Sequence, residues 1–194
     1  MKIASLRLGD LDRMVLEDGR ATRLSWWGER LSRLGIAPGA SGNLSFRSER
    51  GFVITRTGVE LNQIEPGDWV EVTELRRRSD ESLEVDYFGN YEPSRDAFVH
   101  GAVYQQTPAA RSIFHLHDQD MLEKADRLGV PSTDRYYPAG TSESVAEIER
   151  LLTNLPAVDY FVLIEHGIVG WATDIEAAGH LIDRWHRRAK EAND

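Results

Sequence analysis

Two histidines in this chain have the spacing of metal ligands. His115 and His117 flank one residue at the end of an apolar, strand-like segment, 112–116. Side chains alternate along a strand, so both imidazoles fall on one face, about 7 Å apart. Imidazole nitrogens bind zinc at about 2.0–2.1 Å, and two rings on one face can converge on a single ion. An H-x-H pair alone is weak evidence, because such pairs also occur by chance.

A third ligand must come from elsewhere in the chain, and His166 is the leading candidate. It follows the apolar segment 160–164 and lies in a predicted hairpin turn beside Gly167. Glycine at that position permits close approach of another backbone segment. The sequence therefore predicts one divalent metal ion held by His115, His117 and His166.

The other histidines have more than one interpretation. His100 follows Asp96 by four residues on a predicted helix, so the two side chains can face the same way. It is either a metal ligand, a group that supports a ligand, or a packed core histidine. His180 and His186 lie among Arg and Asp residues on the last predicted helix, and packing at the surface or at a helix end explains them.

The elements that position these residues follow from apolar periodicity and turn residues. A helical spacing runs from about 11 to 34 and ends at Gly35 and Pro38, and a further helix is predicted from Pro93 to about Gln106. Helices are also expected at 121–128, after a cap at Thr141 or Ser142, and after a cap at Asp174. Strands are expected at 44–47, 52–55, 69–75, 83–88, 112–116, 160–164 and 168–172.

This order of elements indicates an α/β (α+β-like) fold. Several hairpins between flanking helices favour a central, mainly antiparallel sheet with helices on both faces. With 194 residues and no linker-like segment, residues 1–194 are expected to form a single domain.

Composition excludes several classes of function. The net charge is −9, and the one basic run, at residues 76–78, is interpreted as a solvated loop, so nucleic acid is not an expected partner. The absence of cysteine excludes disulfides and thiolate chemistry. No apolar run reaches the roughly 18 residues that span a bilayer, and the first residues do not resemble a signal peptide. A cytoplasmic protein without a membrane partner is therefore expected.

Six local motifs occur in one order along the chain. They are SGNLSFR (41–47), GFVITRTGVEL (51–61), PGDWVEV (66–72), EPSRDAFVHGAVYQQTP (92–108), SIFHLHD (112–118) and IEHGIVGWATDIEAA (164–178). Together they resemble the class II aldolase/adducin family, which includes fuculose-1-phosphate aldolase and ribulose-5-phosphate 4-epimerase. The resemblance covers about residues 15 to 190.

The resemblance implies a class II aldolase-like fold and a metal-dependent lyase acting on a small sugar phosphate. It implies Zn²⁺, or another divalent ion such as Mn²⁺ or Co²⁺, at the three histidines, with Asp96 as a further ligand or as the catalytic acid/base. It also implies a homotetramer with active sites at subunit borders. The phosphate-binding positions of the family match Gly42, Asn43, Thr57, Gly58, Ser94 and Arg95.

The residue types at these positions agree with phosphate binding. Gly-rich turns offer backbone N–H groups, and Ser94 is predicted at a helix N-terminus, where the dipole favours an anion. Without the resemblance, Gly42 and Gly58 are equally explained as plain turn residues.

Two departures from the family leave the reaction open. Arg95 replaces the second Ser of the P-S-S segment, where a guanidinium either binds phosphate or fills the pocket. The chain is also compact, with 48 residues between His117 and His166 and 28 after His166. Longer family members carry a catalytic tyrosine in this insert and another in the tail. Tyr136 or Tyr137 is the nearest substitute for the first.

Three functions fit these features. The first is aldol cleavage of a phosphorylated ketose through an enediolate. The second is epimerisation or dehydration of a sugar phosphate by the same chemistry, which the Asp at position 96 slightly favours. The third is a non-catalytic, adducin-like assembly domain, against which the retention of all three histidines argues.

Overall fold

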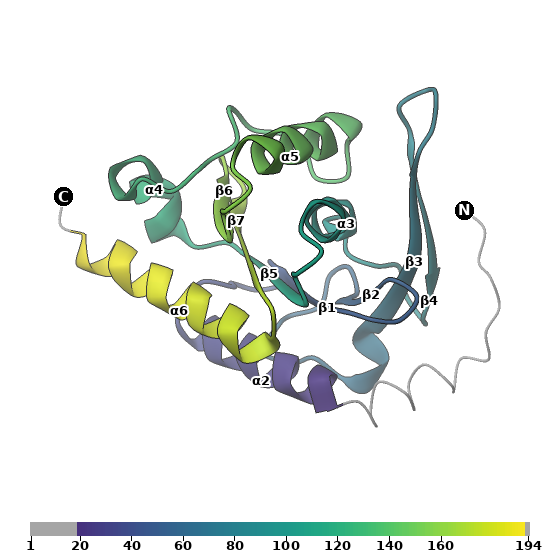
Figure 1. Ribbon diagram of the computed structural model, residues 1–194. Helices are drawn as coiled ribbons and strands as arrows, with labels where there is room; N and C mark the ends of the chain where they lie inside the picture. Colours follow the sequence, from purple (N-terminus) through teal and green to yellow (C-terminus); the bar gives the residue numbers. More distant parts are fainter. Residues whose placement is uncertain (1–18, 193–194) are drawn as a thin grey trace.

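Seven antiparallel strands form one sheet, in the order β4-β3-β2-β1-β5-β7-β6 (Figure 1). The computed structural model describes residues 19–192. The strands are β1 (Asn43–Arg47), β2 (Phe52–Thr55), β3 (Trp69–Arg77), β4 (Leu83–Phe88), β5 (Ser112–Leu116), β6 (Tyr160–Leu163) and β7 (Gly167–Ala172). β5 lies between β1 and β7, so segments far apart in the sequence meet at its two ends.

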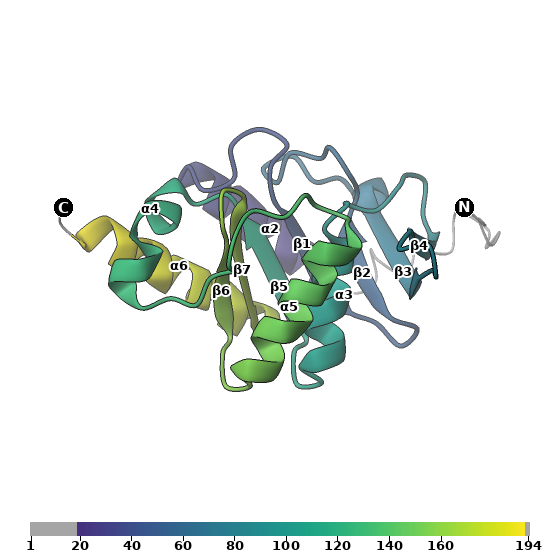
Figure 2. The ribbon, with the colours of Figure 1, turned by 90° about the horizontal axis from the view of Figure 1, so that it is seen from above.

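Helices cover both faces of this sheet (Figures 1 and 2). They are α2 (Gly19–Arg33), α3 (Ala97–Gln106), α4 (Gln119–Leu128), α5 (Ser142–Asn154) and α6 (Ile175–Glu191), with a short 3₁₀ helix at Pro66–Asp68. Buried residues of α2, α4 and α6 belong to one apolar cluster and those of α3 and α5 to another. The predicted antiparallel sheet with helices on both faces is confirmed.

The alternation of side chains in β1 shows how the strands separate the two clusters. Leu44 and Phe46 point into the cluster under α2 and α6, whereas Ser45 points to the other face and contacts His100 of α3. This period of two is what a sheet with both faces covered requires. Since both faces are buried, the pairing register is strongly fixed.

Two of the three helix starts predicted from the sequence are confirmed. Thr141 caps α5 by accepting a hydrogen bond from the backbone N–H of Ser144, and Asp174 caps α6 by accepting one from Ala177. The predicted helix at 11–34 ends at Arg33, and Gly35 follows with φ +82°. Its first part, 11–18, lies outside the described residues.

The prediction that a helix opens at Pro93 is wrong. Pro93 instead forms an isolated β-bridge with Arg56, and α3 begins only at Ala97. The residues between them form a turn in which the N–H of Ala97 donates to the carbonyl of Ser94. A proline before a polar turn fits an extended bridge as well as a helix start, so local sequence did not distinguish the two.

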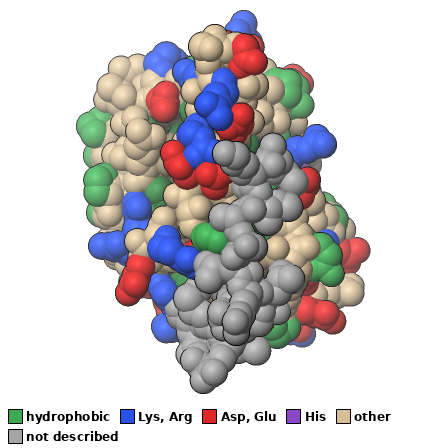
Figure 3. All heavy atoms as spheres, turned by 90° about the vertical axis from the view of Figure 1, so that its right-hand side faces the viewer, with side chains coloured by type: hydrophobic (Ala, Val, Ile, Leu, Met, Phe, Trp, Pro, Cys, Tyr) green, Lys and Arg blue, Asp and Glu red, His purple; other side chains and the backbone are tan. Residues whose placement is uncertain are grey.

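The basic run at 76–78 is not a loop, as the sequence analysis expected, because β3 extends to Arg77. Arg76 donates to Asp86 of β4 over 2.8 Å, and Arg78 pairs with Glu84. Figure 3 shows basic and acidic side chains next to one another on the side of the molecule that carries β4. None of the described helices is long and apolar enough to cross a membrane.

Candidate metal centre

Strand pairing brings the three predicted ligands together at one end of β5. His115 lies opposite Asn43 of β1 on one side and opposite Val169 of β7 on the other. His117 follows directly after β5, and its backbone N–H donates to the carbonyl of Ile36. His166 lies in the β6–β7 turn, where its N–H donates to the carbonyl of Leu163.

The rings of His115, His117 and His166 form a compact cluster. Their centroids are 4.7 to 5.1 Å apart, and one ligand nitrogen from each ring lies within 4.8 Å of the other two. The Nε2 atoms of His115 and His117 are 3.2 Å apart. Two nitrogens bound tetrahedrally to one zinc ion lie about 3.3 Å apart, so this spacing fits a shared cation.

The tautomer of His115 also agrees with a role as metal ligand. Its Nδ1–H donates to the carbonyl of Ile168 over 3.0 Å, which leaves a lone pair on Nε2 in the neutral ring. Such a bond from the second ring nitrogen is the usual support of a metal-binding histidine. The Nε2 atoms of His115 and His117 are close, and two lone pairs facing each other would repel. A proton or a cation must therefore lie between these two nitrogens.

Gly167 permits this close packing, as the sequence predicted. A Cβ atom added there would lie 2.4 Å from the carbonyl oxygen of Leu116 and 2.8 Å from Cε1 of His115. Glu165, the residue before His166, has φ +57°, a left-handed conformation that residues other than glycine rarely adopt outside tight turns. The turn that carries His166 is thus sterically fixed.

Asp96 is the acidic group of the cluster. Its Oδ2 lies 3.5 Å from Nε2 of His115, and its Oδ1 lies 4.0 Å from Nε2 of His166. Oδ2 accepts a hydrogen bond from the Asn43 amide over 2.9 Å, whereas Oδ1 is buried without a hydrogen-bond partner among the described residues. An unpartnered carboxylate oxygen facing imidazole nitrogens is suited to bind a cation or accept a proton.

Burial and charge set the protonation of this cluster. Desolvation lowers the pKa of the fully buried His115 to about 4, although Asp96 opposes the shift. Desolvation also lowers the pKa of His117. Burial alone would raise the pKa of Asp96, but the nearby imidazoles and the Asn43 amide bring it below its ordinary value. Near neutral pH His115 and His117 are therefore neutral and Asp96 is ionised, the states that bind a divalent cation.

The same shifts predict that the metal-free protein is sensitive to acid. His100 is also fully buried, and desolvation lowers its pKa to about 3. Between the ordinary value of 6.5 and these lowered values, the unfolded chain binds protons that the native His100 and His115 do not. Stability is therefore present above pH 6.5 and is lost as pH falls, by about 2 kcal/mol for each imidazole at pH 5.

Urea unfolding of chelator-treated protein between pH 7 and pH 5 measures this effect. A His180→Ala variant, which lacks an exposed histidine of α6, is expected to show the same loss as wild type. A denaturation midpoint that does not change over this range contradicts the assignment of neutral, buried imidazoles.

The predicted phosphate-binding residues form an arc beside the cluster. The N–H of Ser94 donates to the carbonyl of Thr55, and the N–H of Thr57 donates to the carbonyl of Glu92, which joins the 55–58 and 92–96 segments. Gly42 has φ +82°, and a Cβ atom there would lie 2.7 Å from the carbonyl oxygen of His115. The backbone conformation therefore requires glycine at this position.

Asn43 differs from the expectation. Its amide donates to Ser94 Oγ and to Asp96 Oδ2, both over 2.9 Å, so both N–H groups are used within the protein. In this structure Asn43 orients Asp96 rather than offering donors to a phosphate. Ser94 is also not at a helix N-terminus, because α3 begins at Ala97, and the dipole argument for its anion role is wrong.

Arg95 follows Ser94 in this arc, and the two tyrosines belong to the 134–140 loop, whose last residue lies next to Arg95. Arg95 is exposed, and its backbone passes Gly140 at the end of the 134–140 loop. Tyr136 in that loop is 48% exposed, whereas the hydroxyl of Tyr137 donates to Asp134 over 2.8 Å. Tyr136 is therefore the freer of the two hydroxyls.

Sequence reasoning missed two buried histidine contacts. Nδ1 of His100 lies 2.7 Å from Ser45 Oγ, which in turn lies 2.9 Å from the hydroxyl of Tyr104. His186 is buried, and its Nδ1 lies 2.9 Å from Oδ2 of Asp118. No local pattern links residue 45 to residue 100 or residue 118 to residue 186.

Asp118, Asp120 and His186 form a second group with metal-ligand spacing, but the atoms that could bind a metal already have partners within the protein. Asp118 caps α4 and binds His186, while Asp120 pairs with Lys124 and Lys190. Two ammonium groups at the carboxylate disfavour a cation there, so this group holds α4 against α6.

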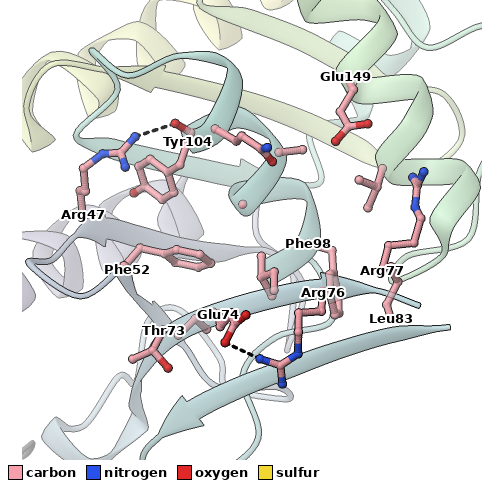
Figure 4. Close-up of a pocket in the computed structure, with 17 residues that line it drawn as sticks. Arg47, Phe52, Thr73, Glu74, Arg76, Arg77, Leu83, Phe98, Tyr104 and Glu149 are labelled. Atoms are coloured by element: carbon pink, nitrogen blue, oxygen red, sulfur yellow. Dashed lines mark hydrogen bonds and ion pairs between the residues drawn. The ribbon is translucent and has the colours of Figure 1, made fainter. Parts of the chain in front are cut away.

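A cavity of about 560 Å³ lies between β3 and α3, away from the histidines (Figure 4). Phe52, Phe98 and Tyr104 form apolar walls, and Arg47 donates to the carbonyl of Tyr104 over 2.7 Å. It contains none of the three clustered histidines and not Asp96. This cavity is therefore separate from the candidate metal centre.

Comparison with known sequences gives one consistent family. Residues 22–192 match the family described as Class II Aldolase and Adducin N-terminal domain. A 3-oxo-tetronate 4-phosphate decarboxylase from Haemophilus influenzae is 26% identical, over 80% of this chain and 78% of that protein. A methylthioribulose-1-phosphate dehydratase from Acidiphilium cryptum is 26% identical, over 81% and 82%. An L-fuculose phosphate aldolase from Escherichia coli is 24% identical, over 76% and 70%.

Solved structures agree on the fold. An L-fuculose-1-phosphate aldolase from Thermus thermophilus superposes with a TM-score of 0.67 at 21% identity, covering 88% of this chain and 91% of that chain. A sugar-phosphate aldolase from Thermotoga maritima gives a TM-score of 0.71 at 15% identity, covering 91% and 94%.

Proposed function

The chain belongs to the class II aldolase and adducin family, and on this premise we propose that it is a metal-dependent lyase that cleaves a small phosphorylated ketose. One observation carries the proposal: three imidazoles with converging nitrogens lie beside a buried carboxylate that has one unpartnered oxygen. Buried polar atoms are normally hydrogen-bonded, so this oxygen is available to a cation or to a proton of the substrate.

His115, His117 and His166 would hold the cation, which we propose to be Zn²⁺ or a similar ion such as Mn²⁺ or Co²⁺. Neutral nitrogen ligands suit these metals, and three protein ligands leave a position open for substrate. Such an ion acts as a Lewis acid toward a carbonyl and an adjacent hydroxyl, stabilising negative charge that develops on them. The Ile168 carbonyl orients His115 for this role.

Asp96 is proposed to move the proton. Its ionised Oδ1 takes the proton of the substrate hydroxyl next to the bond that breaks. The carbon–carbon bond then breaks, one product leaves as an aldehyde, and the electron pair remains on the other product as an enediolate. Asn43 holds Oδ2 throughout, so the free oxygen keeps its direction.

Ser94, Thr57 and the backbone N–H of Gly58 are proposed to bind the phosphate. Thr57 and Gly58 are exposed and Ser94 is half-buried, so a ligand can reach them. Fixing the phosphate sets the distance between the substrate carbonyl and the histidines, which is the positioning part of catalysis. Arg95, which is exposed next to Ser94, adds the positive charge of its guanidinium group at the edge of this arc.

The relatives support a second group of reactions on the same arrangement. Their names include a decarboxylase, a dehydratase and an aldolase, all of phosphorylated substrates. Decarboxylation of a 3-oxo acid, like aldol cleavage, leaves an electron pair on the carbon beside a carbonyl. Epimerisation and dehydration need the same stabilisation. A non-catalytic, adducin-like role is the third candidate, and the intact histidine cluster argues against it.

We also propose that the chain assembles in the cytoplasm as a homotetramer, in which a neighbouring subunit completes the site. The described tyrosine nearest this role, Tyr136, is exposed and so available to a substrate or to another subunit. A second subunit would also exclude water from the exposed phosphate-binding arc.

Product analysis with zinc-loaded protein tests the reaction. Glycerone phosphate mixed with short aldehydes is expected to give a new carbon–carbon bond. Pentulose phosphates and phosphorylated 3-oxo acids serve as the competing substrates. Conversion of those without any condensation contradicts the aldolase assignment, and the absence of turnover on the whole panel supports the non-catalytic alternative.

A further inference from the structure

Buried polar side chains continue from the candidate metal centre along the α3 face of the sheet. Asn43 and Ser45 are two residues apart on β1, so their side chains point to the same face. The first of them contacts Asp96, and the second contacts His100. We propose that His100 is a positioning residue for Asp96, and that its Nε2–H is joined to the free carboxylate oxygen of Asp96 through one buried water molecule. This inference rests on the role proposed for Asp96 above.

His100 lies one helical turn after Asp96. Its backbone N–H donates to the Asp96 carbonyl over 3.0 Å, and side chains four residues apart lie on one side of a helix. Desolvation lowers the pKa of His100 to about 3, and the nearby carboxylate of Asp96 acts against this shift. Within residues 19–192 the two side chains share no direct hydrogen bond or ion pair, so a contact between them needs a bridging group.

The hydroxyl of Tyr104 sets the direction of the hydrogen bonds that end at His100. Burial raises the pKa of Tyr104, so the hydroxyl keeps its proton. Its oxygen lies 2.9 Å from Ser45 Oγ, its only hydrogen-bond partner in the part of the chain that the structure describes. The Tyr104 ring contacts the Arg47 guanidinium at 4.5 Å and the Phe52 ring at 5.2 Å (Figure 4). Because a buried hydroxyl without an acceptor is costly, Tyr104 donates to Ser45 Oγ.

Ser45 in turn determines which nitrogen of His100 carries the proton. A serine hydroxyl has a single hydrogen. Since its oxygen accepts from Tyr104, this hydrogen is free to point to Nδ1 of His100, 2.7 Å away. Nδ1 is then the acceptor, and in the neutral imidazole the proton lies on Nε2. The opposite arrangement, with Nδ1 as donor, leaves either the serine or the tyrosine hydrogen without an acceptor.

The Nε2–H of His100 is thus a buried donor, and it has no hydrogen-bond partner among the described residues. Two acceptors at the centre, Oδ1 of Asp96 and Oδ1 of Asn43, are likewise buried without a partner there. A buried water typically makes about three hydrogen bonds to such groups. One water can accept from His100 and donate to both oxygens, and two hydrogen bonds of about 2.8 Å in series span about 5 Å.

This bridge would fix the direction of the Asp96 carboxylate. The Asn43 amide holds Oδ2, and the water would occupy one of the two lone-pair positions of Oδ1. The other position remains for the cation or for the proton of the substrate. A carboxylate held at both oxygens has little freedom to rotate, which favours the reactive geometry. His100 therefore acts through Asp96 and does not touch the substrate.

The protonated nitrogen of His100 is the first measurement. Long-range ¹H–¹⁵N spectra of the full chain with ¹⁵N-labelled histidine distinguish the two tautomers, and the signal of His100 is identified by its loss in His100→Gln. We expect the proton on Nε2 at neutral pH, with and without zinc. A proton on Nδ1 overturns the proposal. Because the tautomer is measured in wild type and without turnover, this result decides even if a variant fails to fold.

Two substitutions of His100 separate positioning from packing. Asparagine places its amide near the position of Nδ1 and lacks a donor at that of Nε2, whereas glutamine reaches the position of Nε2 and can donate there. With zinc-loaded protein, we expect kcat to fall by about 10- to 100-fold in His100→Asn, with KM and metal content little changed. Most of the activity is expected to return in His100→Gln. The control is His186→Asn, which alters another buried histidine, on α6, and is expected to keep the wild-type kcat.

Equal kcat in His100→Asn and His100→Gln, with an active wild type, would show that His100 only packs in the core. That result overturns the proposal and leaves the proposed function standing. Absence of turnover in wild type, by contrast, removes the proposed function and the role of His100 with it.

Discussion

Replacing His166 with alanine is expected to lower turnover by on the order of 10³-fold or more. His166 supplies one of three converging nitrogens from a turn, and its side chain is 16% exposed. Its removal leaves two ligands and little disturbance of the core, whereas the fully buried His115 also supports the Ile168 carbonyl. The variant therefore separates loss of the centre from loss of the fold.

The measurement is kcat/KM on whichever substrate of the panel wild type converts, with added zinc. His180→Ala on α6 is the control, because it removes an exposed histidine remote from the cluster in sequence. We expect the control to retain wild-type activity and the unfolding midpoint of His166→Ala to change little. Similar activity in both variants would show that the histidine cluster is not the active centre.

Replacing Asp96 with asparagine is expected to lower turnover by about 10²–10⁴-fold, the usual contribution of a positioned acid or base. Asparagine keeps the size of the side chain and can still accept the Asn43 hydrogen bond through its Oδ1. It removes the negative charge and the ability to take a proton. The loss is therefore expected in kcat rather than in phosphate binding.

An Asp126→Asn variant on the exposed side of α4 is the matched control for this change. Metal content separates the two roles of Asp96. If the metal is retained and turnover is lost, Asp96 moves the proton; if both are lost, it is chiefly a ligand. Unchanged kcat in the presence of full metal content would remove Asp96 from the mechanism.

Much of the fold follows from the sequence because period-two and turn signals were strong. The strand predicted at 112–116 and the strand at 83–88 agree with β5 and β4 to the residue. Order in the sheet was not accessible in this way, because β1 pairs with β5 across more than sixty residues. That pairing is what places Asn43 opposite His115, and no local pattern encodes it.

The error at Pro93 has a physical cause that also bears on the site. A proline followed by Ser and Asp fits the start of a helix, yet pairing with Arg56 keeps Pro93 extended and delays α3 to Ala97. Long-range bridging overrides the local preference. As a result Ser94 lies in a turn, and Asp96 becomes the residue directly before the helix.

The sequence predicted the histidine cluster better than it predicted the groups around the cluster. Alternation along β5 and the glycine after His166 both reflect local geometry, which the sequence expresses directly. The pairing of His186 with Asp118 depends on tertiary packing of distant elements. It could be found only once the helices had been placed on the sheet.

The most direct test of the central claim is the metal content of tag-free protein after zinc loading and removal of unbound ions. The account predicts about one zinc per chain in wild type and His180→Ala, and almost none in His166→Ala. Wild-type protein that retains no metal and gains no thermal stability with added zinc, or His166→Ala protein that retains a full equivalent, would contradict it.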